Sequence, residues 1–106
     1  MAETFDVCSI DELPDGEIRI VMTPDVELMV VNCAGEILAM EDRCSHDDGP
    51  LAEGVLDCES CTIECPRHGS VFDLRTGIPK TLPAYTPVET FPVQIGDDGI
   101  VRVTVD

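Results

Sequence analysis

The chain has 106 residues, of which 22 are acidic and six are basic, giving a formal net charge of −16. This length predicts one domain with a modest core and leaves no room for a separate catalytic module. The negative charge disfavours nucleic acid and anionic membranes as partners. It suits docking to basic patches on other proteins, and it equally suits general solubility or adaptation to high salt.

Short apolar or alternating runs, separated by Gly, Pro and Asp, predict short strands along the whole chain. Ser9 and Glu12 form a capping-box pattern that predicts one helical turn at Ile10–Leu13. No window has a sustained helical period, so the predicted class is all-β. The expected strands, in chain order, are Phe5–Cys8, Glu17–Met22, Glu27–Asn32, Glu36–Glu41, Thr62–Cys65, Ser70–Asp73, Glu89–Ile95 and Ile100–Val105.

No apolar run approaches the length of a membrane span, and the most apolar one, at residues 28–31, is expected to be a strand. The N-terminal residues lack the basic and apolar stretches of a signal peptide. Six cysteines without an export signal indicate a reducing compartment and metal binding. We therefore expect a cytoplasmic protein.

Two short motifs each offer one thiol and one imidazole, namely Cys44-x-His46 and Cys65-x-x-His68. This supply matches a [2Fe–2S] cluster whose two irons have different ligands, with both Cys on one iron and both His on the other. All four protein ligand positions are then filled. The predicted site therefore moves electrons and performs no bond chemistry of its own.

Two other metal sites compete with this interpretation. A tetrahedral set of two Cys and two His also suits structural zinc, although zinc fingers usually pair Cys with Cys and His with His. The run Cys58-x-x-Cys61-x-x-x-Cys65-Pro66 is similar to the end of a bacterial [4Fe–4S] motif. That motif requires a further Cys at position 55, which is Val55.

The residues around the two motifs read CSHDDGPL at 44–51 and CPRHGSVFD at 65–73, followed by Thr76-Gly77. In these segments the chain resembles the Rieske ferredoxins, and the resemblance extends over nearly all of residues 1–106. It implies an antiparallel β-sandwich base with a small inserted cluster-binding subdomain at about residues 42–85. It also implies one cluster per chain, bound by Cys44, His46, Cys65 and His68. Residues 82–87 resemble the proline loop that covers the cluster in this family, or form an ordinary rigid connection.

The resemblance implies a monomeric carrier that passes single electrons from an NAD(P)H-dependent ferredoxin reductase to a terminal oxygenase, such as a ring-hydroxylating dioxygenase. The carrier would itself not be an enzyme. An alternative is the small Rieske subunit or accessory protein of a nitrite reductase or of an iron–sulfur assembly system.

Two departures from high-potential members of the family predict a low reduction potential. Gly49 and Arg67 stand where those proteins have the two cysteines of an inter-loop disulfide, and Phe72 stands where they have a tyrosine that donates a hydrogen bond. Ser70 is retained, either as a donor to a sulfide or as a cap of its own turn. We expect a potential at the low end of the Rieske range, near roughly −150 mV.

The other four cysteines have no place in the predicted ligand set. Cys58 and Cys61 are expected to be reduced thiols in a tight turn, with a redox-active or accessory-metal pair as the alternative. Cys8 is expected to fill the core, and Cys33 to be a turn residue.

Overall fold

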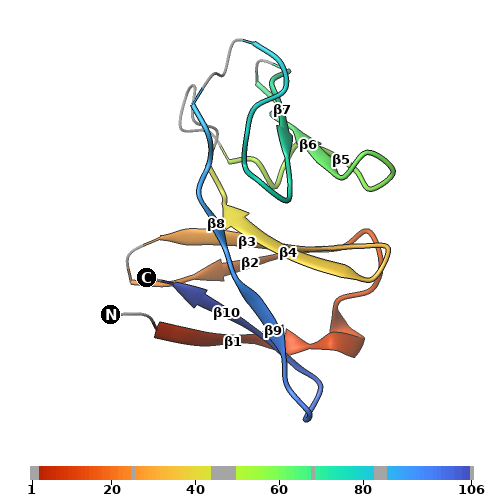
Figure 1. Ribbon diagram of the computed structural model, residues 1–106, viewed down its shortest axis with the longest axis vertical. Helices are drawn as coiled ribbons and strands as arrows, with labels where there is room; N and C mark the ends of the chain where they lie inside the picture. Colours follow the sequence, from red (N-terminus) through yellow and green to blue (C-terminus); the bar gives the residue numbers. More distant parts are fainter. Residues whose placement is uncertain (1–2, 25, 44–49, 68, 83–85, 106) are drawn as a thin grey trace.

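The computed structural model describes residues 3–24, 26–43, 50–67, 69–82 and 86–105. Within these ranges, antiparallel strands form three sheets, with strand orders β1-β10-β9, β2-β3-β4-β8 and β5-β6-β7 (Figure 1). The strands are β1 (Glu3–Ser9), β2 (Ile18–Met22), β3 (Glu27–Cys33), β4 (Glu36–Glu41), β5 (Val55–Asp57), β6 (Thr62–Glu64), β7 (Val71–Asp73), β8 (Thr90–Phe91), β9 (Val93–Ile95) and β10 (Ile100–Val105). A 3₁₀ turn, η1 (Ile10–Glu12), follows β1.

The first two sheets pack face to face as the basal sandwich, which lies in the lower part of Figure 1. β10 alternates between buried and half-buried residues, as expected for a strand with one face on a core. The core between the two sheets is formed by Leu13, Leu28, Val30, Ala39, Phe91, Val101, Val103 and Val105.

β3 is buried on both faces, and this connects the basal sandwich to the third sheet. Leu28 and Val30 face the core of the sandwich, whereas Met29, Val31 and Cys33 belong to a second core on the opposite face. Successive side chains of a strand point to opposite faces, so a strand between two cores carries apolar residues on both faces. The unbroken apolar run at residues 28–31 is therefore a central strand.

The small sheet, β5-β6-β7, covers this second face of β3 and β4 and lies above the sandwich in Figure 1. Ile63 of β6 pairs with Phe72 of β7, and both side chains are fully buried. They pack with the neighbouring Leu51 and Leu74 against Met29 and other residues of β3 and β4. Burial of these large apolar side chains is the main force that holds the small sheet on the base.

The all-β class and the capped helical turn are confirmed. The Ser9 hydroxyl accepts a hydrogen bond from Asp11 N at 3.4 Å, and the Glu12 carboxylate accepts one from Ser9 N at 3.3 Å. Within the described ranges, no helix is both long and apolar enough to cross a membrane.

One predicted strand is wrong, and one strand of the structure was not predicted. The segment 89–95, expected to be one strand, is divided at Pro92: β8 pairs with β4, and β9 pairs with β10. Proline has no N–H for the ladder, so the chain changes sheets there. β5, at Val55–Asp57, was not predicted.

Candidate metal centre

Of the four predicted ligands, only Cys65 lies in the described part of the chain. Cys44, His46 and His68 lie outside the described residues. The centre is therefore built here from Cys65 and from the residues that flank the two motifs.

Cys65 directly follows β6 and begins the tight turn that leads into β7. Its N–H donates to Ser70 O at 2.7 Å, and its carbonyl accepts a hydrogen bond from Gly69 N at 3.1 Å. Gly69 has a φ of 76°, in the left-handed region that glycine adopts without steric cost. The Cys65 side chain is 1% exposed and belongs to no disulfide, so one protected thiol is available at this end of the small sheet.

The first motif begins three positions after the end of β4, and its two flanks are joined by Asp42. The Asp42 carboxylate accepts a hydrogen bond from Ala52 N at 2.7 Å, and Asp42 N donates to Glu27 O at 2.9 Å. Asp42 is only 8% exposed. It therefore ties the entry and the exit of the segment that carries Cys44 and His46 to the start of β3.

Gly54 brings the exit of the first motif close to Cys65. Its N–H donates to Leu51 O at 2.9 Å, and its Cα lies so close to the backbone of Glu64 that a Cβ there would overlap Glu64 O. Glu64 is the residue directly before Cys65. The exit of one motif thus packs on the start of the other, and only glycine allows this approach.

Ser70 and Phe72 share the buried face of the small sheet with Cys65. Both are 0% exposed, and Ser70 O accepts the hydrogen bond from Cys65 N. The Thr81 hydroxyl accepts a hydrogen bond from Val71 N at 2.9 Å and lies 3.4 Å from Gly69 O. Thr81 thus ties the following segment to the turn. Residues 83–85, at the centre of the predicted proline loop, lie outside the described ranges.

Cys58 and Cys61 lie at the opposite end of β6 from Cys65. Three strand residues separate Cys61 from Cys65, which is roughly 13 Å of extended chain at about 3.3 Å per residue. Cys58 is bonded to Cys33, with a Cα–Cα distance of 5.0 Å. This arrangement is incompatible with a single cluster shared by the three cysteines of that run.

The disulfide corrects two expectations. Cys58 is not a reduced thiol, and Cys33 is not a turn residue but the buried last residue of β3. The spacing of the cysteines in the sequence does not predict this pair, because the Cys33–Cys58 contact depends on how the small sheet packs on the base. Cys61 is a free thiol, as expected, and Cys8 packs half-buried against the sandwich core. No group of three or more possible metal ligands occurs among the described side chains.

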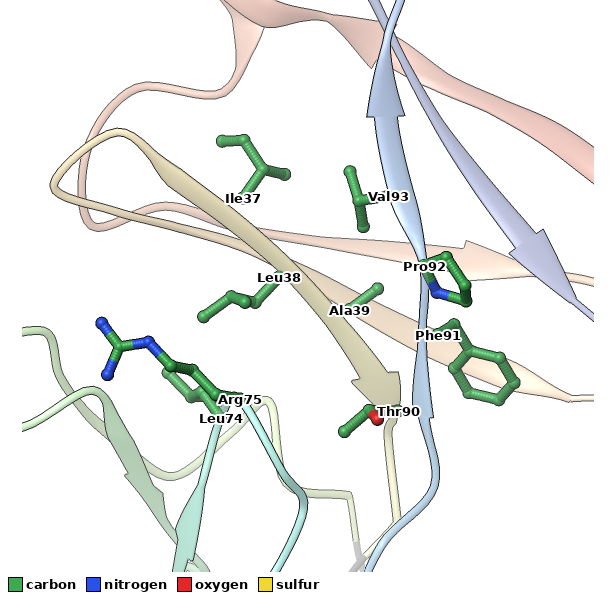
Figure 2. Close-up of a pocket in the computed structure, with 9 residues that line it drawn as sticks. All are labelled: Ile37, Leu38, Ala39, Leu74, Arg75, Thr90, Phe91, Pro92 and Val93. Atoms are coloured by element: carbon green, nitrogen blue, oxygen red, sulfur yellow. The ribbon is translucent and has the colours of Figure 1, made fainter.

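A groove of about 400 Å³ lies between the base and the small-sheet side of the molecule (Figure 2). It is lined by residues of β4, by Leu74 and Arg75, and by the β8–β9 segment. The lining is mostly aliphatic and contains no thiol or imidazole, so the groove is not a metal site. The Arg75 guanidinium points away from Phe91 in this view.

Arg75 forms an ion pair with Glu36 next to this groove. Its Nη2 lies 2.7 Å from Glu36 Oε1, and its Nε lies 2.9 Å from Oε2. This hydrogen bonding lowers the pKa of Glu36 below its ordinary value, and the carboxylate raises the pKa of Arg75. Both side chains are exposed, so the ion pair adds little to the stability of the fold. Its main effect is to orient β4 and the segment after β7 relative to each other.

A model of the Rieske [2Fe–2S] domain matches residues 3–92. The chain belongs to the Rieske [2Fe–2S] family. A curated relative, the 3-phenylpropionate/cinnamic acid dioxygenase ferredoxin subunit of Photorhabdus laumondii, is 44% identical over 99% of this chain and 96% of its own length.

Solved Rieske ferredoxins share the fold. The ferredoxin of carbazole 1,9a-dioxygenase from Nocardioides aromaticivorans superposes with a TM-score of 0.89 at 34% identity, over 94% of this chain and 95% of that one. A chain from a complex of oxygenase and ferredoxin of carbazole 1,9a-dioxygenase gives 0.88 at 35% identity, over 94% and 91%. A Mycobacterium tuberculosis chain described as a nitrite reductase small subunit gives 0.85 at 16% identity, over 100% and 97%, which shows the fold alone.

The family carries a [2Fe–2S] cluster, and the chain's chemistry fits that group. Cys65 offers a free, buried thiol at a turn stabilised by backbone hydrogen bonds, and the sequence adds one more Cys and two His in the family's order. Sequence reasoning missed Asp42 and Gly54, which frame the loops. Their position beside the first motif was the available signal.

Proposed function

We propose that this chain is a Rieske ferredoxin that carries single electrons from a reductase to the terminal oxygenase of a ring-hydroxylating dioxygenase. The observation that supports this most strongly is the match to the ferredoxin subunit of a dioxygenase along almost the whole of both chains. The chain is then an electron carrier and not a catalyst.

The proposed ligands are Cys44, His46, Cys65 and His68, which would bind one [2Fe–2S] cluster per chain. When bound, the cluster accepts and releases one electron at a time. The chain supplies the setting: the Cys65 turn is closed by two backbone hydrogen bonds, and Asp42 fixes the first motif at both of its flanks. Such fixed loops keep the donor atoms in place in both redox states, which lowers the cost of reorganisation.

The proposed arrangement is a single domain, residues 1–106, with a cluster-binding subdomain at about residues 42–85. The small sheet supports this division, because it packs on the base through a core of its own. The proposed partners are an NAD(P)H-dependent ferredoxin reductase and a terminal oxygenase, and the proposed state is a cytoplasmic monomer. The net charge of −16 supports steering towards basic docking patches.

The test is reconstitution with the purified reductase and terminal oxygenase of an aromatic-ring dioxygenase system. Oxidation of NADH should be coupled to product formation only when this chain is present. The His68→Ala variant should fail to restore coupling. Stable co-purification with a nitrite reductase large subunit, together with no coupling to any oxygenase tested, would favour the alternative function.

A further inference from the structure

Cys33 and Cys58 join the two parts of the molecule. Cys33 ends β3 in the basal sandwich, whereas Cys58 lies in the turn between β5 and β6 of the small sheet. Their Cα atoms are 5.0 Å apart, within the range that a disulfide spans. Cys33 is 4% exposed and Cys58 is half-buried, so a small reagent can reach the pair only from the side of Cys58.

Cys33 ends β3 directly before the β3–β4 turn, and Cys58 lies in the β5–β6 turn; both turns are held without help from the bond between the two cysteines. After β3, Gly35 N donates to the Asn32 carboxamide at 2.9 Å and Ala34 N donates to the Asp15 carboxylate at 2.5 Å. The side chain of the buried Asn32 also donates to Leu13 O at 2.7 Å, which ties this turn to the sandwich.

The turn after β5 is held in a similar way. The Asp57 carboxylate accepts hydrogen bonds from Glu59 N at 3.0 Å and from Ser60 N at 3.3 Å, and the bond from Ser60 contributes most to lowering the pKa of Asp57. The two sulfur atoms are therefore kept close in the dithiol state as well. A preformed pair of this kind closes at high effective concentration and opens without unfolding the chain.

The neighbouring thiol does not compete for Cys58. Cys61 is 3% exposed, and burial raises the pKa of its thiol, so little reactive thiolate is present near neutral pH. Its carbonyl accepts a hydrogen bond from Leu74 N at 3.0 Å, which fixes its backbone to the segment after β7.

We propose that Cys33 and Cys58 are a reversible dithiol–disulfide site that locks the small sheet onto the basal sandwich, with low-molecular-weight disulfides as the oxidant. The Cys58 thiolate attacks the small disulfide, forming a mixed disulfide and releasing one small thiol. The Cys33 thiolate then attacks Cys58 Sγ, forming the Cys33–Cys58 bond and releasing a second small thiol. The two cysteines lose two electrons to the small disulfide, and their protons pass to its thiols.

The closed loop contains the first ligand motif. Cys33 and Cys58 are 25 positions apart, and Cys44 and His46 lie between them. A crosslink of this span restricts the unfolded chain and opposes separation of the small sheet from the base. High-potential relatives have a disulfide between the two ligand loops, and this chain lacks it. The Cys33–Cys58 crosslink constrains one of those loops in its place.

The test is thiol mapping of the folded holoprotein equilibrated in glutathione buffers of rising oxidised fraction. Free thiols are blocked with a maleimide in denaturant, and cleavage after Arg43 and Glu59 places Cys33, Cys58 and Cys61 on separate peptides. The expected result is coupled loss of label from Cys33 and Cys58, reversed by reduced glutathione, with Cys61 labelled throughout. Persistent labelling of Cys33 and Cys58 at every ratio, or a Cys58–Cys61 link, would overturn the proposal.

A second measurement compares the melting temperatures of the oxidised and reduced forms. The oxidised wild-type protein should melt on the order of 10 °C higher than the reduced form. The difference should vanish in Cys33→Ser and in Cys58→Ser, and it should remain in the matched control Cys8→Ser. Equal melting temperatures for the two wild-type forms would contradict the lock. Thiol mapping reads the state of Cys33 and Cys58 and not electron transfer, so it can fail or succeed independently of the proposed function.

Discussion

Asp42 is the residue on which the position of the first motif most depends. Its carboxylate is buried and accepts the Ala52 N–H from across the segment 43–51. Asp42→Ala leaves that N–H without its partner, so we expect a loss of about 1–3 kcal/mol in the free energy of unfolding. Chemical denaturation measures this loss, and a chelator should also bleach the variant's cluster faster.

The exposed Asp97, in the turn between β9 and β10, provides the control for removing one carboxylate. Asp97→Ala should change the free energy of unfolding by no more than about 0.5 kcal/mol. Equal effects of the two substitutions would show that Asp42 does not hold the loop.

Phe72 is the single side chain on which the expected reduction potential most depends. It is fully buried on the same face of the small sheet as Cys65 and Ser70, and it has no hydroxyl to donate to sulfur. We expect a wild-type potential near roughly −150 mV and a higher one in Phe72→Tyr, because a donor near sulfur stabilises the reduced cluster. Protein-film voltammetry measures both values, and a wild-type potential well above zero would contradict the low-potential account.

At the scale of elements, Gly54 controls how the exit of the first motif packs on β6. A methyl group at this position would overlap the carbonyl of Glu64. Gly54→Ala should therefore lower the melting temperature and the iron content of the purified protein. Gly16, where a Cβ would meet nothing within 4 Å, provides a control with its own cost from a φ of 84°. Gly54 does not have a positive φ, so its effect comes from close packing, and a Gly54→Ala variant that melts like wild type and keeps its iron would contradict this explanation.

The Glu36–Arg75 ion pair connects β4 to the segment after β7. Because the pKa of Glu36 is lowered from 4.5 by hydrogen bonding to Arg75, its contribution is complete above pH 4.5 and is lost as the pH falls through the lowered value. Glu36→Gln should thus be slightly less stable than wild type at pH 7, and the difference should shrink below pH 4.5. Denaturation at a series of pH values tests this, with Glu53→Gln as the control for one lost charge. A difference that is constant down to pH 3 would argue against the pair.

Much of the element structure follows from local patterns, whereas the connections between elements do not. Turn residues and alternation located β1 to β4 and β10, and the capping box located η1. The division of segment 89–95 at Pro92 could not be predicted locally, because it depends on β8 and β9 pairing in different sheets. The Cys33–Cys58 bond joins residues 25 positions apart across the boundary between the base and the small sheet, and no local rule reports such a contact. Motif spacing predicted the ligand set, but the contacts that Asp42 and Gly54 make with Ala52 and Glu64 appear only in the folded structure.

At the scale of the whole molecule, the basal sandwich supports the fold, and the small sheet holds the proposed cluster ligand Cys65. The basal sandwich has its own core, and β3 carries a second core on which the small sheet rests. The end of the small sheet that holds Cys65 is remote from the end that holds Cys58. The proposed electron-transfer centre and the proposed redox lock therefore lie at opposite ends of one sheet, so the two can be tested with separate variants.

The central claim is that the four motif residues hold one [2Fe–2S] cluster with mixed sulfur and nitrogen ligation. The most direct test is electron paramagnetic resonance of the anaerobically purified, dithionite-reduced protein, together with metal analysis. The account predicts two irons per chain and a rhombic signal of low average g, lost or replaced in His46→Ala and in His68→Ala and kept in Cys61→Ser. Stoichiometric zinc without iron, or an unchanged signal in both histidine variants, would contradict it.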